Sequence, residues 1–167
     1  MLNQDGYSIR DYRQTDETAV LALNQNSVSQ LSPMDAARLQ QLQQQASVFW
    51  VVEKQQQVVA FVLGFRESVE YDSVNYQWFC QHQDQFLYID RIVVDEAARS
   101  MRIGQRLYQC LEQWAADKAV PRLVAEINLL PPNPGSINFH RNQGFVEIGQ
   151  LQIDAHKRVS LQMKELL

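Results

Sequence analysis

Three arginines stand where an apolar run gives way to a helical pattern, a setting suited to binding an anion. Arg99, Arg102 and Arg106 follow the apolar run at residues 89–94, and apolar residues then recur at helical spacing. The first turn of a helix leaves about four backbone N–H groups without intrahelical partners and carries about half a positive charge. The strand, loop and helix start at residues 88–105 therefore predict a pyrophosphate site.

The loop sequence resembles the acetyl-CoA-binding motif of the GNAT N-acetyltransferase superfamily. The core of that motif is Arg or Gln, two residues, Gly, one residue, and Gly or Ala; Arg99 and Gly104 match its first and last positions. Arg102 takes the place of the first glycine, so we expect it at a negative φ with its Cβ turned away from the phosphates. The resemblance implies that acetyl-CoA is bound by backbone atoms of Ile92, Val93 and Val94 along the pantetheine arm, and by Arg99, Ser100, Met101, Arg102, Ile103, Gly104 and Gln105 around the pyrophosphate.

A second stretch, at residues 133–145, resembles the other signature of that superfamily. There an asparagine near a helix start is followed seven residues later by a tyrosine, and then by Gly-Phe; here Asn133 and the pair Gly144 and Phe145 match. The resemblance implies that Asn133 bonds the pantetheine arm. His140 replaces the tyrosine, whose hydroxyl in the family protonates the departing thiolate. With an ordinary pKa near 6.5 it would be partly charged at pH 7 and able to act as that acid, or it would contact CoA as a neutral donor.

Acetyl transfer to an amine also needs a base. An alkylammonium with a pKa of about 10.4 is neutral in only about 0.04% of molecules at pH 7. Glu126 lies near the end of the strand expected at residues 122–127, and a glutamate at a similar place sometimes serves as the base in the superfamily. Glu126 is therefore the candidate base, and the alternative is an ion-paired or solvent-facing carboxylate.

The acceptor site is less well marked. Residues 24–31 and residues 71–86 remain to build it. The second segment lies mostly in an aromatic-rich connection at residues 67–85, and its candidates to wall an amine or aromatic acceptor are Tyr71, Tyr76, Trp78, Phe79 and Phe86. Packing of these aromatic residues onto the domain or a homodimer contact would explain this segment as well. Arg91 either pairs with Asp90 or contacts the acceptor. Cys110 falls on the apolar seam of its helix, so we expect direct attack in a ternary complex rather than a covalent cysteine route.

The elements expected around these residues agree with the same resemblance. Their order is a strand, two helices capped at Thr15 and Ser32, three strands, a helix, a strand, a helix and two strands. This order resembles the α/β GNAT fold: a mixed central sheet of about seven strands with a splayed parallel pair, and about four helices. The 167 residues fit a single GNAT domain over residues 1–167.

Composition excludes several classes of function. The formal net charge of −4 argues against a nucleic-acid partner. No apolar run is long enough for a membrane span, and no signal peptide is evident, so we expect a cytoplasmic protein. The scattered cysteines and histidines predict no metal site.

The expected function is an acetyl-CoA-dependent N-acetyltransferase acting on a primary amine of a small molecule or peptide. The alternative is a non-catalytic acyl-CoA-binding or regulatory module that retains the pyrophosphate site. Arg102 and His140 both depart from the superfamily pattern, as they would in a module that had lost turnover.

Overall fold

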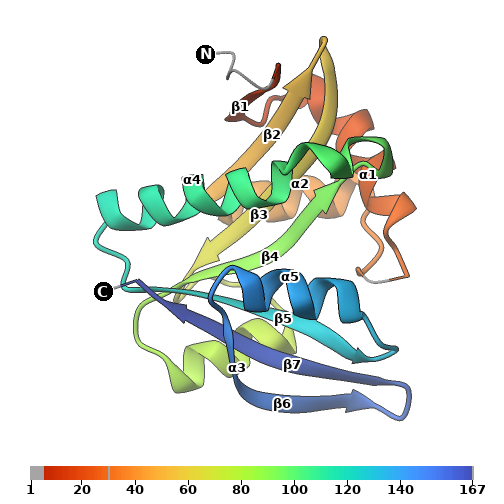
Figure 1. Ribbon diagram of the computed structural model, residues 1–167. Coiled ribbons are helices and arrows are strands. Elements are labelled where there is room, and N and C mark those ends of the chain that lie inside the picture. The colour runs from red at the N-terminus through yellow and green to blue at the C-terminus, as the bar shows by residue number, and fades with distance from the viewer. Residues whose placement is uncertain (1–5, 30, 167) are drawn as a thin grey trace. The chain divides into compact units, whose positions relative to one another are not determined.

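The computed structural model describes residues 6–29 and 31–166, which form a mixed α/β fold around one seven-stranded sheet (Figure 1). The strand order is β1-β2-β3-β4-β5-β7-β6. The strands are β1 (Ser8–Asp11), β2 (Val48–Lys54), β3 (Gln57–Arg66), β4 (Leu87–Val94), β5 (Arg122–Leu130), β6 (Val146–Asp154) and β7 (Lys157–Glu165). The helices are α1 (Glu17–Asn26), α2 (Ala36–Gln45), α3 (Val74–His82), α4 (Ile103–Asp117) and α5 (Pro134–Asn142), with short 3-10 helices η1 (Gln14–Asp16) and η2 (Glu96–Met101).

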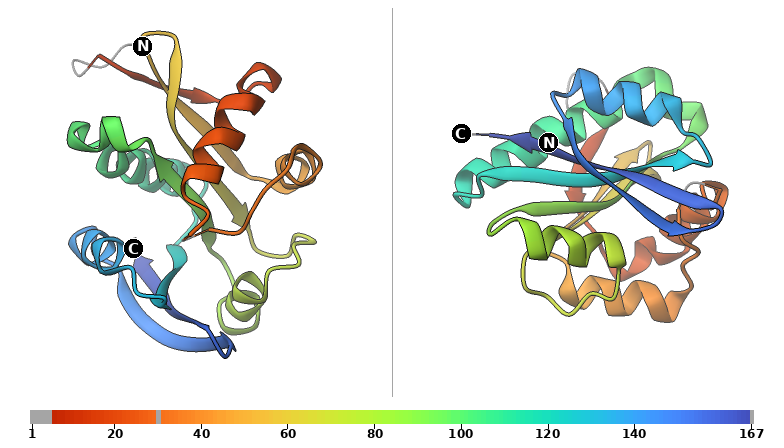
Figure 2. Two further views of the ribbon diagram at one scale, coloured as in Figure 1. Left: turned by 90° about the vertical axis from the view of Figure 1, so that its right-hand side faces the viewer. Right: turned by 90° about the horizontal axis from the view of Figure 1, so that it is seen from below.

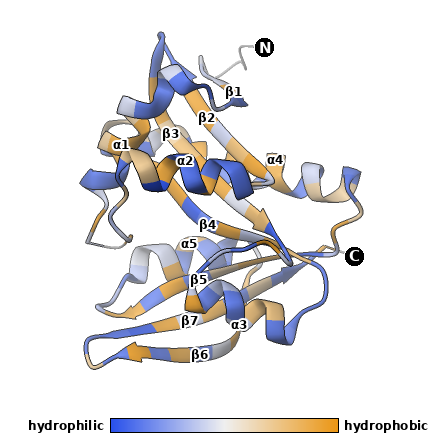
Figure 3. Ribbon diagram, turned by 180° about the vertical axis from the view of Figure 1, so that it is seen from behind, coloured by the Kyte–Doolittle hydropathy of each residue, from blue (hydrophilic) through white to orange (hydrophobic). Residues whose placement is uncertain are grey.

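The chain divides into two compact units, the first comprising Met1–Phe65 and Asp90–Gln109. In this unit β1 and β2 pair antiparallel, and so do β2 and β3, with Val51 opposite Phe61. Helices α1 and α2 lie on one face of these strands and the start of α4 lies on the other (Figure 2). The apolar residues of β2 and β3, whose ribbon segments are orange in Figure 3, are largely buried and form the core between these layers.

The second unit comprises Arg66–Ile89 and Cys110–Leu167. Strands β5, β7 and β6 pair antiparallel, and the start of β4 runs parallel to β5, with Leu87 opposite Leu123. Helices α3 and α5 cover opposite faces of these strands (Figure 2). The expected mixed sheet of seven strands with a parallel pair is thus confirmed.

The helix count differs from the expected one. The described residues hold five α-helices rather than about four, because α3 forms within the segment expected as a connection at residues 67–85. The Ser73 hydroxyl caps this helix by accepting from the Tyr76 N–H at 3.3 Å. Tyr76 and Phe79 are then buried, so tertiary packing stabilises a sequence whose own helix propensity is low.

Two expected helix starts were also wrong. Helix α1 begins after Asp16 rather than Thr15, which lies in η1. Helix α2 begins after Asp35 rather than Ser32, and the Asp35 carboxylate accepts from the Arg38 N–H at 2.8 Å. The displaced start leaves the Ser32 carbonyl available for a tertiary contact described below.

Candidate functional site

The predicted pyrophosphate site lies in the first unit, where β4 leads through η2 into α4. We call residues 99–106 the cradle. The Asp95 N–H donates to the Val59 carbonyl at 2.8 Å, which fixes the start of the loop to β3. The Arg106 N–H donates to the Arg102 carbonyl at 3.1 Å, as the first bond of the α4 ladder. In helical geometry the N–H groups at residues 103–105 then have no acceptor within the ladder, and a bound anion can accept from them.

Arg102 has the backbone of a glycine. It ends η2 at φ 55° and ψ 28°, in the left-handed region, so the expected negative φ is wrong. Arg102 is the one residue between the end of η2 at Met101 and the start of α4 at Ile103. A non-glycine residue there costs about 1–2 kcal/mol, which explains the glycine of the superfamily motif at this position.

The three arginines of the cradle carry uncompensated charge. Arg99, Arg102 and Arg106 are exposed, and no carboxylate of the described residues forms an ion pair with them. Arg106 donates to the Gln109 side-chain oxygen at 3.2 Å, a neutral acceptor. Three unpaired cations beside a helix start give this loop a strong preference for anions.

Strand β4 alternates in burial as it approaches the cradle. Ile92 and Val94 are half-buried, whereas Val93 is buried on the opposite side. Arg91 shares that side and is only 4% exposed.

Of the two roles considered for Arg91, the pairing with Asp90 is observed, at 2.9 Å. Arg91 also donates to the Asn24 side-chain oxygen at 2.9 Å and to the Ser32 carbonyl at 2.8 Å, and Asn24 donates to the same carbonyl at 3.1 Å. This network leaves no local signal in the sequence, because Arg91 lies 59 and 67 residues from its two partners. Arg91 therefore anchors the segment between α1 and α2.

Asn133 caps helix α5 in the second unit. Its side-chain oxygen accepts from the Ser136 N–H at 3.3 Å, and its own N–H donates to the Asn128 carbonyl at 3.3 Å. Pro134 occupies the first helical position, where its missing N–H costs nothing. The side-chain NH₂ group of Asn133 offers two N–H donors besides this cap, and a pantetheine oxygen can accept from them.

His140 is buried on α5 at 4% exposure, edge-on to Phe145 with ring centroids 5.2 Å apart. Its Nδ1 lies 2.8 Å from the Ser136 carbonyl oxygen, which can only accept, so we assign the proton of the neutral ring to Nδ1. Burial lowers the pKa of His140, with the Ser136 hydrogen bond opposing this in part. The imidazolium at pH 7 is therefore less populated than an ordinary pKa implies.

Glu126 is half-buried on β5, opposite Leu161 of β7. Leu161 in turn lies opposite Gly149 of β6, so all three residues share one face of the sheet. A Cβ atom added at Gly149 would come within 3.1 Å of the Trp78 ring. Glu126 thus projects from the face that α3 covers.

The aromatic residues considered for the acceptor site are mostly core residues. Tyr71, Tyr76, Phe79 and Phe86 are buried around Tyr88. Only Trp78 of the set is half-buried, and it stacks on His82 with ring centroids 3.8 Å apart.

Within residues 6–29 and 31–166, no three histidine, cysteine, aspartate or glutamate side chains gather as a metal site would require. No helix in the same ranges has the length and apolarity to cross a bilayer.

Comparison with known proteins identifies the fold and the family. The model of the acetyltransferase (GNAT) family matches residues 9–145. Among solved structures, Ard1 from Thermoplasma volcanium aligns with a TM-score of 0.79 at 19% identity, over 97% of this chain and 99% of that chain. Chaetomium thermophilum Naa20 in complex with a bisubstrate analogue gives 0.77 at 18%, over 95% and 86%. Arabidopsis thaliana Naa50 in complex with the bisubstrate analogue CoA-Ac-MVNAL gives 0.72 at 14%, over 95% and 98%. No curated protein sequence matches the chain.

Proposed function

The chain belongs to the acetyltransferase (GNAT) family and is an acetyl-CoA-dependent N-acetyltransferase. We propose that it acetylates a primary amine by direct attack in a ternary complex. The acceptor is a small molecule or a peptide. The Naa50 relative, solved with a peptide-bearing bisubstrate analogue, supports including peptides among the acceptors.

The observation that carries this proposal is the cradle at the start of α4. Its arginines have no carboxylate partner among the described residues, and the helix start adds N–H donors. We assign the pyrophosphate of CoA to residues 99–105. The backbone at residues 92–94 would pair with the pantetheine amides, as an added strand pairs with a sheet edge.

In this proposal the second unit supplies Asn133 and His140. Asn133 donates to the pantetheine arm through its NH₂ group, while its oxygen caps α5. His140 contacts CoA as a neutral ring, because burial lowers its pKa and the Nδ1 bond to the Ser136 carbonyl opposes that shift only in part. The alternative role as general acid would require the imidazolium, which the lowered pKa disfavours.

Glu126 is the proposed base. It accepts a proton from the ammonium of the acceptor, directly or through water, and the freed amine nitrogen attacks the thioester carbonyl carbon. The C–S bond then breaks and CoA leaves as thiolate, while the nitrogen gives up its second proton to that thiolate or to water, so that the products are a neutral amide and CoA. Replacing Glu126 with Gln should lower kcat at pH 7 by about a hundredfold or more and leave the Kd of CoA unchanged.

A screen for thiol release tests the proposed function. Purified protein with acetyl-CoA is offered polyamines, amino acids, aminoglycosides and short peptides, and free CoA is measured with a thiol reagent. The proposal predicts turnover with at least one class, abolished by prior acetylation of the amine. Tight CoA binding with no release across the whole panel would favour the alternative, a non-catalytic acyl-CoA-binding or regulatory module.

A further inference from the structure

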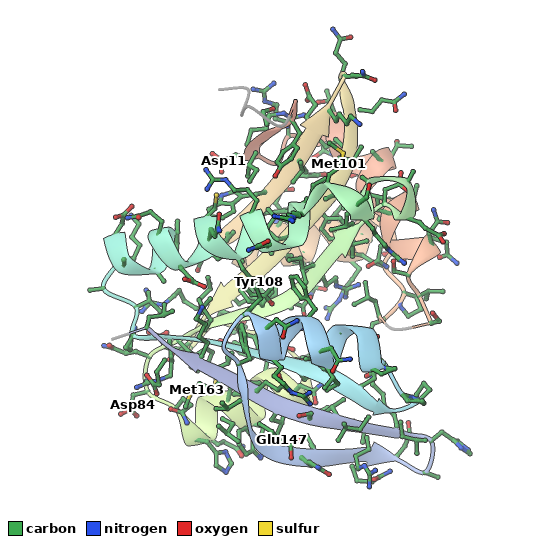
Figure 4. The ribbon with its side chains drawn as sticks, in the orientation of Figure 1. Asp11, Asp84, Met101, Tyr108, Glu147 and Met163 are labelled. Carbon is green, nitrogen blue, oxygen red and sulfur yellow. The ribbon has the colours of Figure 1, made fainter. Side chains whose placement is uncertain are left out.

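A fourth cation lies beside the cradle, and it comes from a different part of the first unit. Lys54 is the last residue of β2, and its ammonium lies 3.4 Å from the Met101 sulfur at the end of η2. Figure 4 shows Met101 against the β2–β3 hairpin. A thioether is a weak acceptor, and within residues 6–29 and 31–166 no carboxylate forms an ion pair with Lys54.

The hairpin holds Lys54 in place. Lys54 pairs with Gln57 across a two-residue turn in which Gln55 and Gln56 have φ of 49° and 64°, as a type I′ turn requires. The Asp95 N–H donates to the Val59 carbonyl of β3 at 2.8 Å. The same hairpin is therefore bonded to the loop that forms the cradle, and the ammonium of Lys54 lies at the edge of that loop beside Met101.

The pyrophosphate, which we assign to the helix start and the arginines, is only part of the negative charge of CoA. CoA carries a pyrophosphate and a separate 3′-phosphate, and a phosphate monoester bears about −1.5 to −2 at pH 7. Lys54 stands on the hairpin side of η2, whereas Arg106 belongs to α4 beyond the loop. The 3′-phosphate is separate from the pyrophosphate, and Lys54 is likewise separate from the arginines, so we pair these two groups.

We propose that Lys54 binds the 3′-phosphate of CoA and so makes the enzyme selective for CoA over its 3′-dephospho form. This inference rests on the proposed function, because it takes the cradle to be the CoA site. The contact is a charge-assisted hydrogen bond from the ammonium to a phosphate oxygen.

Isothermal titration of CoA and of 3′-dephospho-CoA into wild type and Lys54→Met tests it. Methionine keeps the apolar stem and removes the charge. We expect the variant to bind CoA about fivefold or more weakly and to bind dephospho-CoA as wild type does. Lys54→Arg should restore most of the preference for CoA, since a guanidinium also binds phosphate.

Lys118→Met is the matched control, because this exposed lysine follows α4 in the second unit and should affect neither ligand. Equal losses for both ligands in Lys54→Met would place Lys54 at the pyrophosphate and overturn the 3′-phosphate assignment. Unchanged affinities would overturn it too. Failure of wild type to bind either ligand would instead contradict the proposed function.

Discussion

Arg102 combines a cationic side chain, which favours anion binding, with a left-handed backbone, which lowers stability. The charge favours an anion beside α4, while the φ of 55° destabilises the fold. The resemblance to a glycine-containing motif identified the position, but the sign of φ was not predictable from it. The sign depends on how η2 joins α4, which is a property of the loop as a whole.

Arg102→Gly should separate these effects. Relief of the left-handed strain, less the greater chain entropy of glycine, should raise the free energy of unfolding by about 0.5–1 kcal/mol in urea titration. The Kd of CoA should rise about fivefold because one cation is lost. Arg102→Lys, which keeps strain and charge, is the control; a destabilised glycine variant would show that the side chain stabilises the loop.

His140 should make stability depend on pH. Its folded pKa lies below the ordinary value of about 6.5, so the unfolded chain binds the proton more tightly. The contribution is present above pH about 6.5 and is lost as pH falls through the folded pKa. His140→Asn, whose amide can replace the Nδ1 donor to Ser136, should lose less stability than wild type between about pH 7 and pH 5. Parallel urea midpoints for the two proteins over this range would contradict the buried neutral ring.

At the scale of elements, local patterns predicted most of the strands and helices but misplaced helix starts where distant residues compete. The serine before Pro33 has the form of a cap, yet α2 starts after Asp35, and the Ser32 carbonyl instead accepts from Arg91. Helix α3 was missed because its aromatic residues pack into a core formed with distant strands. The cap at Ser73 is the one local signal that could have indicated it.

The β2–β3 hairpin offers a test at this scale. Gln56 has a φ of 64°, a conformation that glycine adopts without strain, so Gln56→Gly should stabilise the protein by about 0.5 kcal/mol. Gln57→Gly, one residue on and inside β3, is the matched control and should destabilise by about 0.5–1 kcal/mol. Thermal unfolding measures both, and equal signs would contradict the type I′ turn.

At the scale of the whole molecule, a chain of net charge −4 concentrates unpaired cations at one loop of its first unit. The sequence predicts only part of this charge distribution. The three arginines are close together in the sequence and could be identified from it. Lys54 could not, because a hairpin brings this lysine beside Met101, which is 47 residues away in the sequence. The family and the order of strands were predictable because they depend on motifs and periodicity, whereas the protonation of His140 depends on burial.

Hydrogen exchange tests whether residues of both units bind one cosubstrate. Saturating CoA should slow amide exchange at residues 92–106 in the first unit and at residues 133–145 in the second. The control is adenosine, which lacks the phosphates and the pantetheine arm. Protection confined to residues 92–106 would leave Asn133 and His140 outside the CoA site.

The central claim is that the loop before α4 holds the pyrophosphate of CoA, and the Kd of CoA for Gly104→Val tests it most directly. Gly104 is the second residue of α4 and matches the last position of the superfamily motif. A β-branched side chain there should crowd the phosphates, whereas Gly104→Ala controls for the backbone change, and circular dichroism confirms folding. The account predicts that the valine variant binds CoA about tenfold or more weakly, a change of about 1.4 kcal/mol. A folded valine variant with the affinity of wild type would contradict the account.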